Sequence, residues 1–269
     1  MHIDHLTSSQ NPRIKDLQLL QDKSRHRRER GLFVVEGLRE IKQSLIAGFH
    51  PEAIYYCDEL LTEKDILKIA EGHNCQISSV SKYLYEKIAY RGSTEGIIGV
   101  LHSKSTSLSK IKLRENPLIL VLESIEKPGN LGAILRTADA SGVDLVIICD
   151  PLTDLYNPNI IRSSLGGVFS NTIVCTDSDH AINWLKTNKV NILTAQLQDS
   201  DLYYQIDMSS STAIVLGPED KGLSNKWREA SNHKIRIPML GELDSLNVSI
   251  SGSILCYEAL RQRNNNTNK

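Results

Sequence analysis

The last part of the chain contains the feature that most constrains its fold: two short strand-like segments that each stop at a glycine- or proline-containing loop. Residues Ala213 to Leu216 precede Gly217-Pro218, and residues Ile235 to Ile237 precede Pro238. Apolar segments this short are typical of buried strands rather than helices. Ligands of open α/β sheets bind outside the carboxyl ends of the strands, so the two loops predict a binding site.

Earlier segments extend the same pattern into a parallel sheet. Further strands are expected at residues 118–122, 145–149, 173–175 and 192–194. Between the first two of these, apolar residues recur at helical spacing from Leu131 to Ala138. Asn130 is the expected N-cap of that helix and Gly142 its expected end. Alternating strands and helices of this kind predict an α/β domain with a sheet of about six parallel strands.

The N-terminal part predicts a second, smaller α/β domain. Its expected strands are residues 32–35, 53–57, 76–80 and 96–101, with helical segments between them and a first helix at 11–21. The polar stretch 103–114 is interpreted as a linker. We therefore expect one domain at 1–106 and a second at 107–269. A helix is expected at 249–263, and the polar tail from residue 264 is expected to be disordered.

Charge limits how this chain could bind nucleic acid. The formal net charge is −1, so any basic surface must be local. The segment Lys23 to Arg30 contains five Lys or Arg residues and one Glu. Arg25, Arg27 and Arg28 are therefore candidate contacts to RNA phosphates. The alternative is that this segment is a solvated connector.

Several classes of protein are disfavoured by the composition. No apolar run approaches the roughly 20 residues of a membrane span, and the N-terminus lacks the features of a signal peptide. The five cysteines are odd in number and widely spaced, and the histidines are scattered. These features predict a cytoplasmic protein with reduced thiols, no metal site and no membrane partner.

Three motifs resemble those of a known family. Gly217 to Leu223 (GPEDKGL) resembles the G-x-E-x-x-G-L motif of the SpoU-type RNA ribose 2′-O-methyltransferases of the SPOUT superfamily. Asn130 to Arg136 (NLGAILR) resembles the family's N-x-G-x-x-x-R motif, and Ile237 to Ser249 resembles its last motif. Many relatives have D-P-x where this chain has Glu126 to Gly129. The segment Phe33 to Gly37 resembles the RNA-binding domain that precedes many SpoU catalytic domains and is itself similar to a ribosomal protein.

The resemblance implies both a fold and a reaction. It implies a C-terminal sheet threaded as a trefoil knot, S-adenosylmethionine as methyl donor and an RNA ribose 2′-hydroxyl as acceptor. The implied cofactor-binding residues are Thr194, Gly217, Ile237 and Leu246. The implied catalytic residues are Arg136, Asn130, Glu219, Ser245 and Asn247.

The role of Arg136 has two interpretations. A guanidinium stays protonated, so within the family's reaction Arg136 is expected to stabilise negative charge on the hydroxyl or an adjacent phosphate. Glu219 could hold it by two parallel hydrogen bonds. Spacing alone also fits a surface ion pair with Asp139.

The foremost functional hypothesis is S-adenosylmethionine-dependent 2′-O-ribose methylation of structured RNA, chiefly ribosomal RNA, by a homodimer. The alternatives are a transfer-RNA target, a ribosomal site whose methylation gives antibiotic resistance, a non-catalytic RNA-binding protein on the same fold, and a small-molecule α/β enzyme.

Overall fold

The computed structural model describes residues 3–90 and 95–267 of the chain, with side chains up to residue 265. The chain forms two compact units. The first comprises Met1–Lys104 together with Asp154–Phe169, and the second comprises Ser105–Thr153 and Ser170–Lys269. The sequence interpretation assigned Asp154–Phe169 to the C-terminal domain, whereas this segment packs within the first unit.

The first unit is built on a mixed five-stranded sheet in the order β1-β4-β3-β5-β2. Strand β5 is antiparallel to β2 and β3, and the other pairs are parallel. The strands are β1 (Asp4–Leu6), β2 (Leu32–Glu36), β3 (Pro51–Cys57), β4 (Gln76–Val80) and β5 (Ile97–His102). The helices are α1 (Pro12–Asp22), α2 (Ser24–Arg30), α3 (Leu38–Ile46), α4 (Glu63–Ile69), α5 (Lys82–Ile88) and α7 (Pro158–Ser164). The four predicted strands are confirmed, and β1 was missed.

The segment Asp154–Phe169 completes an aromatic cluster in the first unit. The ring of Tyr156 stacks on Phe33 with centroids 4.2 Å apart, and Phe169 meets Phe49 edge to face at 5.3 Å. Both phenylalanines belong to the N-terminal part of the chain and are buried. Aromatic pairs at these separations add to the stabilisation that burial alone provides. The later segment is therefore a part of this unit's core.

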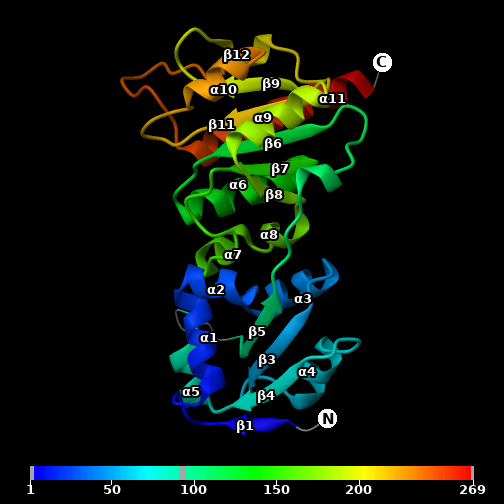
Figure 1. Ribbon diagram of the computed structural model, residues 1–269, viewed down its shortest axis with the longest axis vertical. Coiled ribbons are helices and arrows are strands. Elements are labelled where there is room, and N and C mark those ends of the chain that lie inside the picture. The colour runs from blue at the N-terminus through cyan, green and yellow to red at the C-terminus, as the bar shows by residue number, and fades with distance from the viewer. Residues whose placement is uncertain (1–2, 91–94, 268–269) are drawn as a thin grey trace. The chain divides into compact units, whose positions relative to one another are not determined.

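The second unit contains a parallel seven-stranded sheet in the order β10-β12-β9-β11-β6-β7-β8, whose larger strands lie side by side in Figure 1. The strands are β6 (Leu118–Glu123), β7 (Leu145–Cys149), β8 (Ile173–Thr176), β9 (Asn191–Ala195), β10 (Asp201–Leu202), β11 (Thr212–Leu216) and β12 (His233–Arg236). The remaining elements are α6 (Pro128–Ser141), α9 (Ser178–Thr187), α10 (Asn225–Ala230), α11 (Val248–Thr267) and the 3₁₀ turns η1 (Leu108–Lys110) and η2 (Tyr203–Gln205). The short helix α8 (Gly167–Ser170) contributes its first three residues to the first unit. The parallel α/β prediction is confirmed.

The central strands β6 and β11 explain why this sheet forms. Both are almost entirely apolar and are buried along their whole length, as strands covered on two faces must be. Helix α6 follows β6 and ends at Gly142, whose φ of 69° provides the expected left-handed cap. Helix α11 packs against α6. The threading of the chain as a knot stays a prediction.

Helix α11 extends further than expected. It continues to Thr267, so the prediction of a disordered tail from residue 264 is wrong for residues 264–267. The guanidinium of Arg263 donates hydrogen bonds to the carbonyl oxygens of Asn116, Pro117, Met208 and Ser210. These bonds hold the helix against two loops of the unit. None of the helices in the described ranges is both long and apolar enough to cross a membrane.

Candidate active site

The loop after β11 closes tightly on itself. The amide of Gly222 donates to the carbonyl oxygen of Pro218 at 3.0 Å, and Gly222 has a φ of +62°, a conformation that glycine adopts readily. A Cβ added at Gly217 would lie 2.8 Å from the backbone of Gly222 and of Leu223. The family resemblance implied that Gly217 binds the cofactor. In the structure, the backbone of its own loop is what excludes a side chain there.

A cavity of about 330 Å³ lies beside this loop, at the carboxyl ends of β9, β11 and β12. Three of the predicted cofactor residues, Gly217, Ile237 and Leu246, line it. Thr194 is absent from the described residues of its wall, and the neighbouring Ala195 is present. The Thr194 hydroxyl is fully buried and donates to Ser231 Oγ at 2.9 Å. Thr194 therefore supports the fold rather than the cavity.

The wall of the cavity combines apolar and charged side chains. Its apolar part includes Leu216, Ile237, Met239, Leu246 and Leu255, and its charged part includes Glu219, Asp220, Lys221, Arg228, Arg236 and Asp244. Ligand pockets commonly have this composition, in which apolar walls bind a ring system and a few polar groups fix its orientation. The cavity suits a ligand with one flat apolar part and one charged part.

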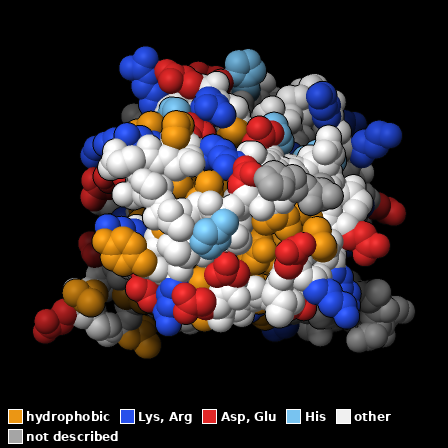
Figure 2. Space-filling model, turned by 90° about the horizontal axis from the view of Figure 1, so that it is seen from below, with side chains coloured by type: hydrophobic (Ala, Val, Ile, Leu, Met, Phe, Trp, Pro, Cys, Tyr) orange, Lys and Arg blue, Asp and Glu red, His pale blue; other side chains and the backbone are white. Residues whose placement is uncertain are grey.

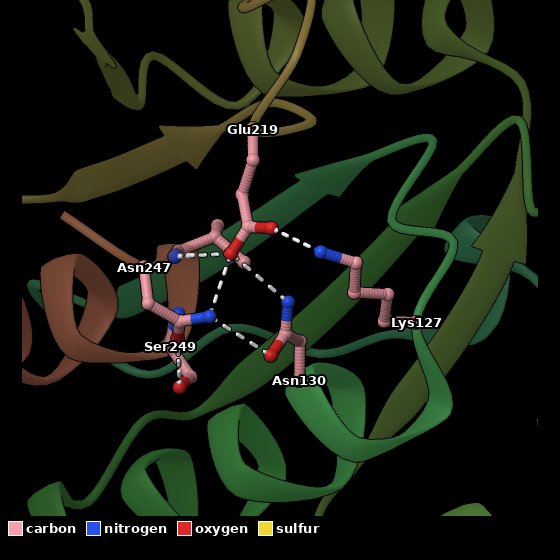
Figure 3. Close-up of polar contacts among 6 residues, drawn as sticks. Lys127, Asn130, Glu219, Asn247 and Ser249 are labelled. Carbon is pink, nitrogen blue, oxygen red and sulfur yellow. Dashed lines mark hydrogen bonds and ion pairs between the residues drawn. The ribbon is translucent and has the colours of Figure 1, made fainter. Parts of the chain in front are cut away.

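A polar network centred on Glu219 lies at the wall of this cavity (Figure 3). Glu219 Oε2 accepts a hydrogen bond from the Lys127 ammonium at 2.8 Å. Its Oε1 accepts from the side-chain amide of Asn247 at 2.6 Å, from that of Asn130 at 3.2 Å and from the Val248 backbone amide at 3.2 Å. The Lys127 ammonium, and after it the Val248 amide, lowers the pKa of the Glu219 carboxyl. Glu219 is therefore an ionised group whose orientation is fixed by four donors.

The two asparagines link the first and last motifs. Asn247 Nδ2 also donates to Asn130 Oδ1 at 3.1 Å, while Asn247 Oδ1 accepts from the backbone amide and the hydroxyl of Ser249. Asn130 is not the N-cap that the sequence predicted, because α6 begins at Pro128 and is preceded by Lys127. This start leaves the Asn130 side chain free to face Glu219. Ser245 lines the cavity and is exposed.

Arg136 has neither of its predicted partners. It is an exposed residue in the middle of α6. Within residues 3–90 and 95–267 it forms no hydrogen bond or ion pair, so it meets neither Glu219 nor Asp139. Its guanidinium is available to a group from outside this chain.

The predicted RNA contacts in α2 differ from one another. Arg27 is only 4% exposed, and its guanidinium donates to Asp154 at 2.5 Å and to the carbonyl oxygens of Leu20 and Gln21. Arg27 cannot contact a phosphate without breaking these bonds, so it is a structural residue. Arg25 and Arg28 are exposed, and Arg25 forms an ion pair with Glu29.

Lys127 and Ser249 are the members of the network that sequence reasoning did not assign. Lys127 occupies the segment where this chain departs from the D-P-x of many relatives, and that departure was the available signal. Ser249 belongs to the quoted last motif, but a serine at the start of a helix is ordinarily interpreted as a cap. Lys127 joins the network only through Glu219, which is distant in sequence, and Ser249 joins it through Asn247, two residues earlier.

The fold and the site together define a two-domain α/β enzyme with its ligand cavity at the carboxyl ends of parallel strands. The chain belongs to the SpoU rRNA Methylase family, whose model matches residues 117–257. Residues 11–99 match the MRM3-like substrate binding domain. The predicted resemblance to SpoU-type enzymes with an N-terminal substrate-binding domain is confirmed.

Relatives and solved structures resemble the chain over nearly its whole length. It is 29% identical to the 23S rRNA (uridine(2479)-2′-O)-methyltransferase of Streptomyces viridochromogenes, covering 95% of this chain and 92% of that protein. It is 27% identical to the 23S rRNA (guanosine(2553)-2′-O)-methyltransferase RlmP of Bacillus subtilis, covering 94% of this chain and 97% of that protein. The crystal structure of an AdoMet-bound rRNA methyltransferase from Sinorhizobium meliloti superposes with a TM-score of 0.89 at 28% identity. The match covers 96% of this chain and 98% of that one.

Proposed function

We propose that this protein transfers a methyl group from S-adenosylmethionine to a ribose 2′-hydroxyl of ribosomal RNA. The observation that carries the proposal is the network in which Asn130, Glu219 and Asn247, one from each family motif, meet at the wall of a ligand-sized cavity. The similar enzymes of Streptomyces viridochromogenes and Bacillus subtilis are 2′-O-methyltransferases of 23S rRNA, which supports the large-subunit RNA as the substrate class.

The two relatives act on different bases, one a uridine and the other a guanosine. A ribose 2′-hydroxyl is common to every RNA nucleotide, and contacts to the sugar and phosphate carry no direct sequence information. The base identity of the target is therefore a property of the RNA-binding surface rather than of the Glu219 network.

The residues of the cavity fit S-adenosylmethionine. Leu216, Ile237 and Leu246 offer an apolar slot for an adenine, and the charged side chains on the wall face the polar remainder of such a molecule. The tight loop closed by Gly217 gives the slot a backbone wall. When bound, S-adenosylmethionine supplies the activated methyl group.

The proposed role of the chain's own residues is to align the hydroxyl and to stabilise charge on it. A hydroxyl is a weak nucleophile, so its position and the removal of its proton limit the rate. Glu219 is ionised and held by Asn130 and Asn247, so it presents a fixed negative group beside the cavity. Ser245, which lines the cavity, is proposed to position the ribose. Arg136 stabilises the developing oxyanion or the adjacent phosphate.

We further propose that the enzyme is a homodimer in the cytoplasm. Apolar side chains are exposed on the last loop and on α11: Leu240 (99%), Leu243 (75%), Ile250 and Tyr257. Ile250 and Tyr257 are seven residues apart and so lie on one face of α11. Exposed apolar groups of this size mark protein interfaces, and a second copy of the chain would cover them.

The chemical proposal is tested by replacing Arg136. We expect Arg136→Ala to fold and to bind S-adenosylmethionine normally, because the Arg136 side chain is exposed and forms no hydrogen bond or ion pair within the described residues. We expect its single-turnover rate of methyl transfer to unmodified 23S rRNA to fall by at least ~100-fold, the scale for losing a charge-stabilising group. Arg136→Lys should restore little, since an ammonium lacks the planar pair of donors.

Arg114→Ala is the matched control, because Arg114 is an exposed arginine of the same unit that pairs with Asp144. Its transfer rate should stay near that of the parent protein. A normal rate in Arg136→Ala would remove Arg136 from the mechanism.

A further inference from the structure

The basic segment α2 is largely neutralised by its own surroundings. Arg25 pairs with Glu29, Arg30 pairs with Asp16, and Arg27 is buried against Asp154. On the face of the first unit drawn in Figure 2, Lys and Arg side chains are likewise interspersed with Asp and Glu, with no broad field of one sign. Helix α2 therefore offers few unpaired cations to an RNA.

A groove runs between α3 and α4 of the first unit. It consists of two adjoining hollows of about 650 and 420 Å³ that share Leu38 and Lys42. Its apolar lining consists of Leu38, Leu45, Ile46, Leu61 and Ile69. The side chain of Ile46 is 87% exposed, which is unusual for an isoleucine in a folded domain. Such an apolar surface is suited to contact with a partner.

Three cations border this groove: Arg39, Lys42 and Lys68. Within the described residues, Arg39 and Lys42 form no hydrogen bond or ion pair. The lining also contains two acidic residues: Glu95 accepts a hydrogen bond from the backbone amide of Leu38, and Asp65 accepts one from the hydroxyl of Thr62 and interacts electrostatically with Lys68. Arg39 and Lys42 are thus the two cations of the groove without assigned partners, and they lie beside its apolar lining.

We propose that the groove between α3 and α4 binds unpaired nucleotides of the RNA substrate. The apolar floor contacts the bases, and Arg39, Lys42 and Lys68 contact the phosphates on either side. Bases are accessible to apolar side chains only where they are not paired in a helix, so this combination favours loops or single strands over duplex RNA. The inference rests on the proposed function for its substrate class, and every lining residue of the groove lies within residues 11–99, which match the substrate-binding domain.

The test measures RNA affinity rather than methyl transfer. The probes are a fluorescein-labelled RNA hairpin with an unpaired loop and a fully paired duplex with the same stem sequence. Arg39→Ala/Lys42→Ala is compared with Lys15→Ala/Lys82→Ala, which removes the same charge from exposed lysines outside the groove. We expect the groove variant to bind the hairpin at least about tenfold more weakly and its salt slope to fall by about 1.4, since each lost contact to a single strand removes about 0.7. The control should change less than about twofold.

The apolar floor is tested separately by Ile46→Ser. Because Ile46 carries no charge, this variant should weaken hairpin binding several-fold while leaving the salt slope unchanged, and it should reduce the preference for the hairpin over the duplex. Thermal unfolding verifies that each variant is folded.

The proposal would be overturned if the groove and control variants bound the hairpin with equal affinity and equal salt slope. It would also be overturned if every variant, including Ile46→Ser, kept the preference for the hairpin over the duplex. Binding of S-adenosylmethionine and the Arg136→Ala experiment report on the methyltransferase function independently. A failure of the groove is therefore distinguishable from a failure of the proposed reaction.

Discussion

A glutamate and a glycine lie at the ends of both strands β2 and β11, but the pKa values of the two glutamates are shifted in opposite directions. Strand β2 ends at Glu36 and is followed by Gly37, and β11 is followed by Gly217, Pro218 and Glu219. Glu219 accepts four hydrogen bonds and is ionised, with a lowered pKa.

Glu36 has far fewer donors. Its Oε2 accepts from the backbone amide of Tyr90 at 2.9 Å, and its Oε1 is buried with no hydrogen-bond partner in the described chain. Burial, only partly offset by that amide and by Arg162, raises the pKa of the Glu36 carboxyl to about 7. The comparison teaches that the donors around a strand-end glutamate, rather than its position, decide whether it carries a permanent charge.

The largest effect is expected at the glycine of the β11 loop. Gly217→Val places side-chain carbons where the backbone of Gly222 and Leu223 lies, so the loop that walls the cavity cannot close. We expect no measurable binding of S-adenosylmethionine by isothermal titration. Gly241→Val is the control, because a Cβ at Gly241 meets nothing within 4 Å, and it should bind normally. Full binding by a folded Gly217→Val protein would refute the assignment of this loop.

A smaller effect, on the rate of methyl transfer, is expected when Glu219 loses its charge. Glu219→Gln keeps the shape of the side chain but brings an amide against the Lys127 ammonium or the Asn247 amide. We expect the single-turnover rate to fall by about 100-fold with cofactor binding retained. Glu229→Gln, a change at an exposed glutamate outside the cavity lining, should have no effect. An unchanged rate in Glu219→Gln would mean that the network only shapes the fold.

The pKa of Glu219 also fixes the sign of its response to pH. The pKa is lowered from 4.5, so the stabilisation that the charged network gives the native state is present above pH 4.5. It is lost only as the pH falls further, through the pKa of the folded protein.

The smallest effect is expected at Glu36, and it concerns stability. Its pKa is raised from 4.5 to about 7, so below pH 4.5 the carboxyl is protonated in both states. As the pH rises from 4.5 to 7, the unfolded chain ionises first and the native state loses stability, and this loss is complete above pH 7. Glu36→Gln should remove this loss.

Urea unfolding of Glu36→Gln and the parent protein at several pH values between 5 and 8 provides the measurement. The free energy of unfolding of the variant should exceed that of the parent increasingly as the pH rises, and Glu86→Gln on the exposed side of α5 should follow the parent. A difference that does not vary with pH would show that Glu36 is not titrating in this window.

Most of the fold was predictable because its strands are apolar and long enough to show a pattern. Strands β1 and β10 have three and two residues, too few for any periodicity. Helix α2, with the sequence SRHRRER, has no apolar stripe, so it was interpreted as a connector or a phosphate-binding patch. The partner that buries Arg27 is Asp154, far away in the sequence, and local patterns carry no information about such a pairing.

Site residues could be predicted from the sequence where a family motif specifies the residue type. They could not be predicted where the role of a residue depends on contacts that only the fold creates. Gly217 and Glu219, both named from a motif, line the cavity, and the side-chain amide of Asn247 donates to Glu219. Thr194 does not line the cavity, whereas the next residue, Ala195, does, because successive side chains of a strand point to opposite sides. Lys127 was missed because a lysine before a proline has no signature of its own.

The contribution of Asp154–Phe169 to the first unit has a consequence for protein synthesis. During translation the N-terminal residues emerge first, but Tyr156, Phe169 and Asp154 are not yet made when residue 104 leaves the ribosome. Until these three residues are made, the phenyl rings of Phe33 and Phe49 lack the aromatic partners that cover them, and the guanidinium of Arg27 lacks its counter-ion. At translation rates of roughly 5–20 residues per second, the nascent unit waits several seconds with this surface open. During that interval a chaperone has access to a site that the finished enzyme no longer exposes.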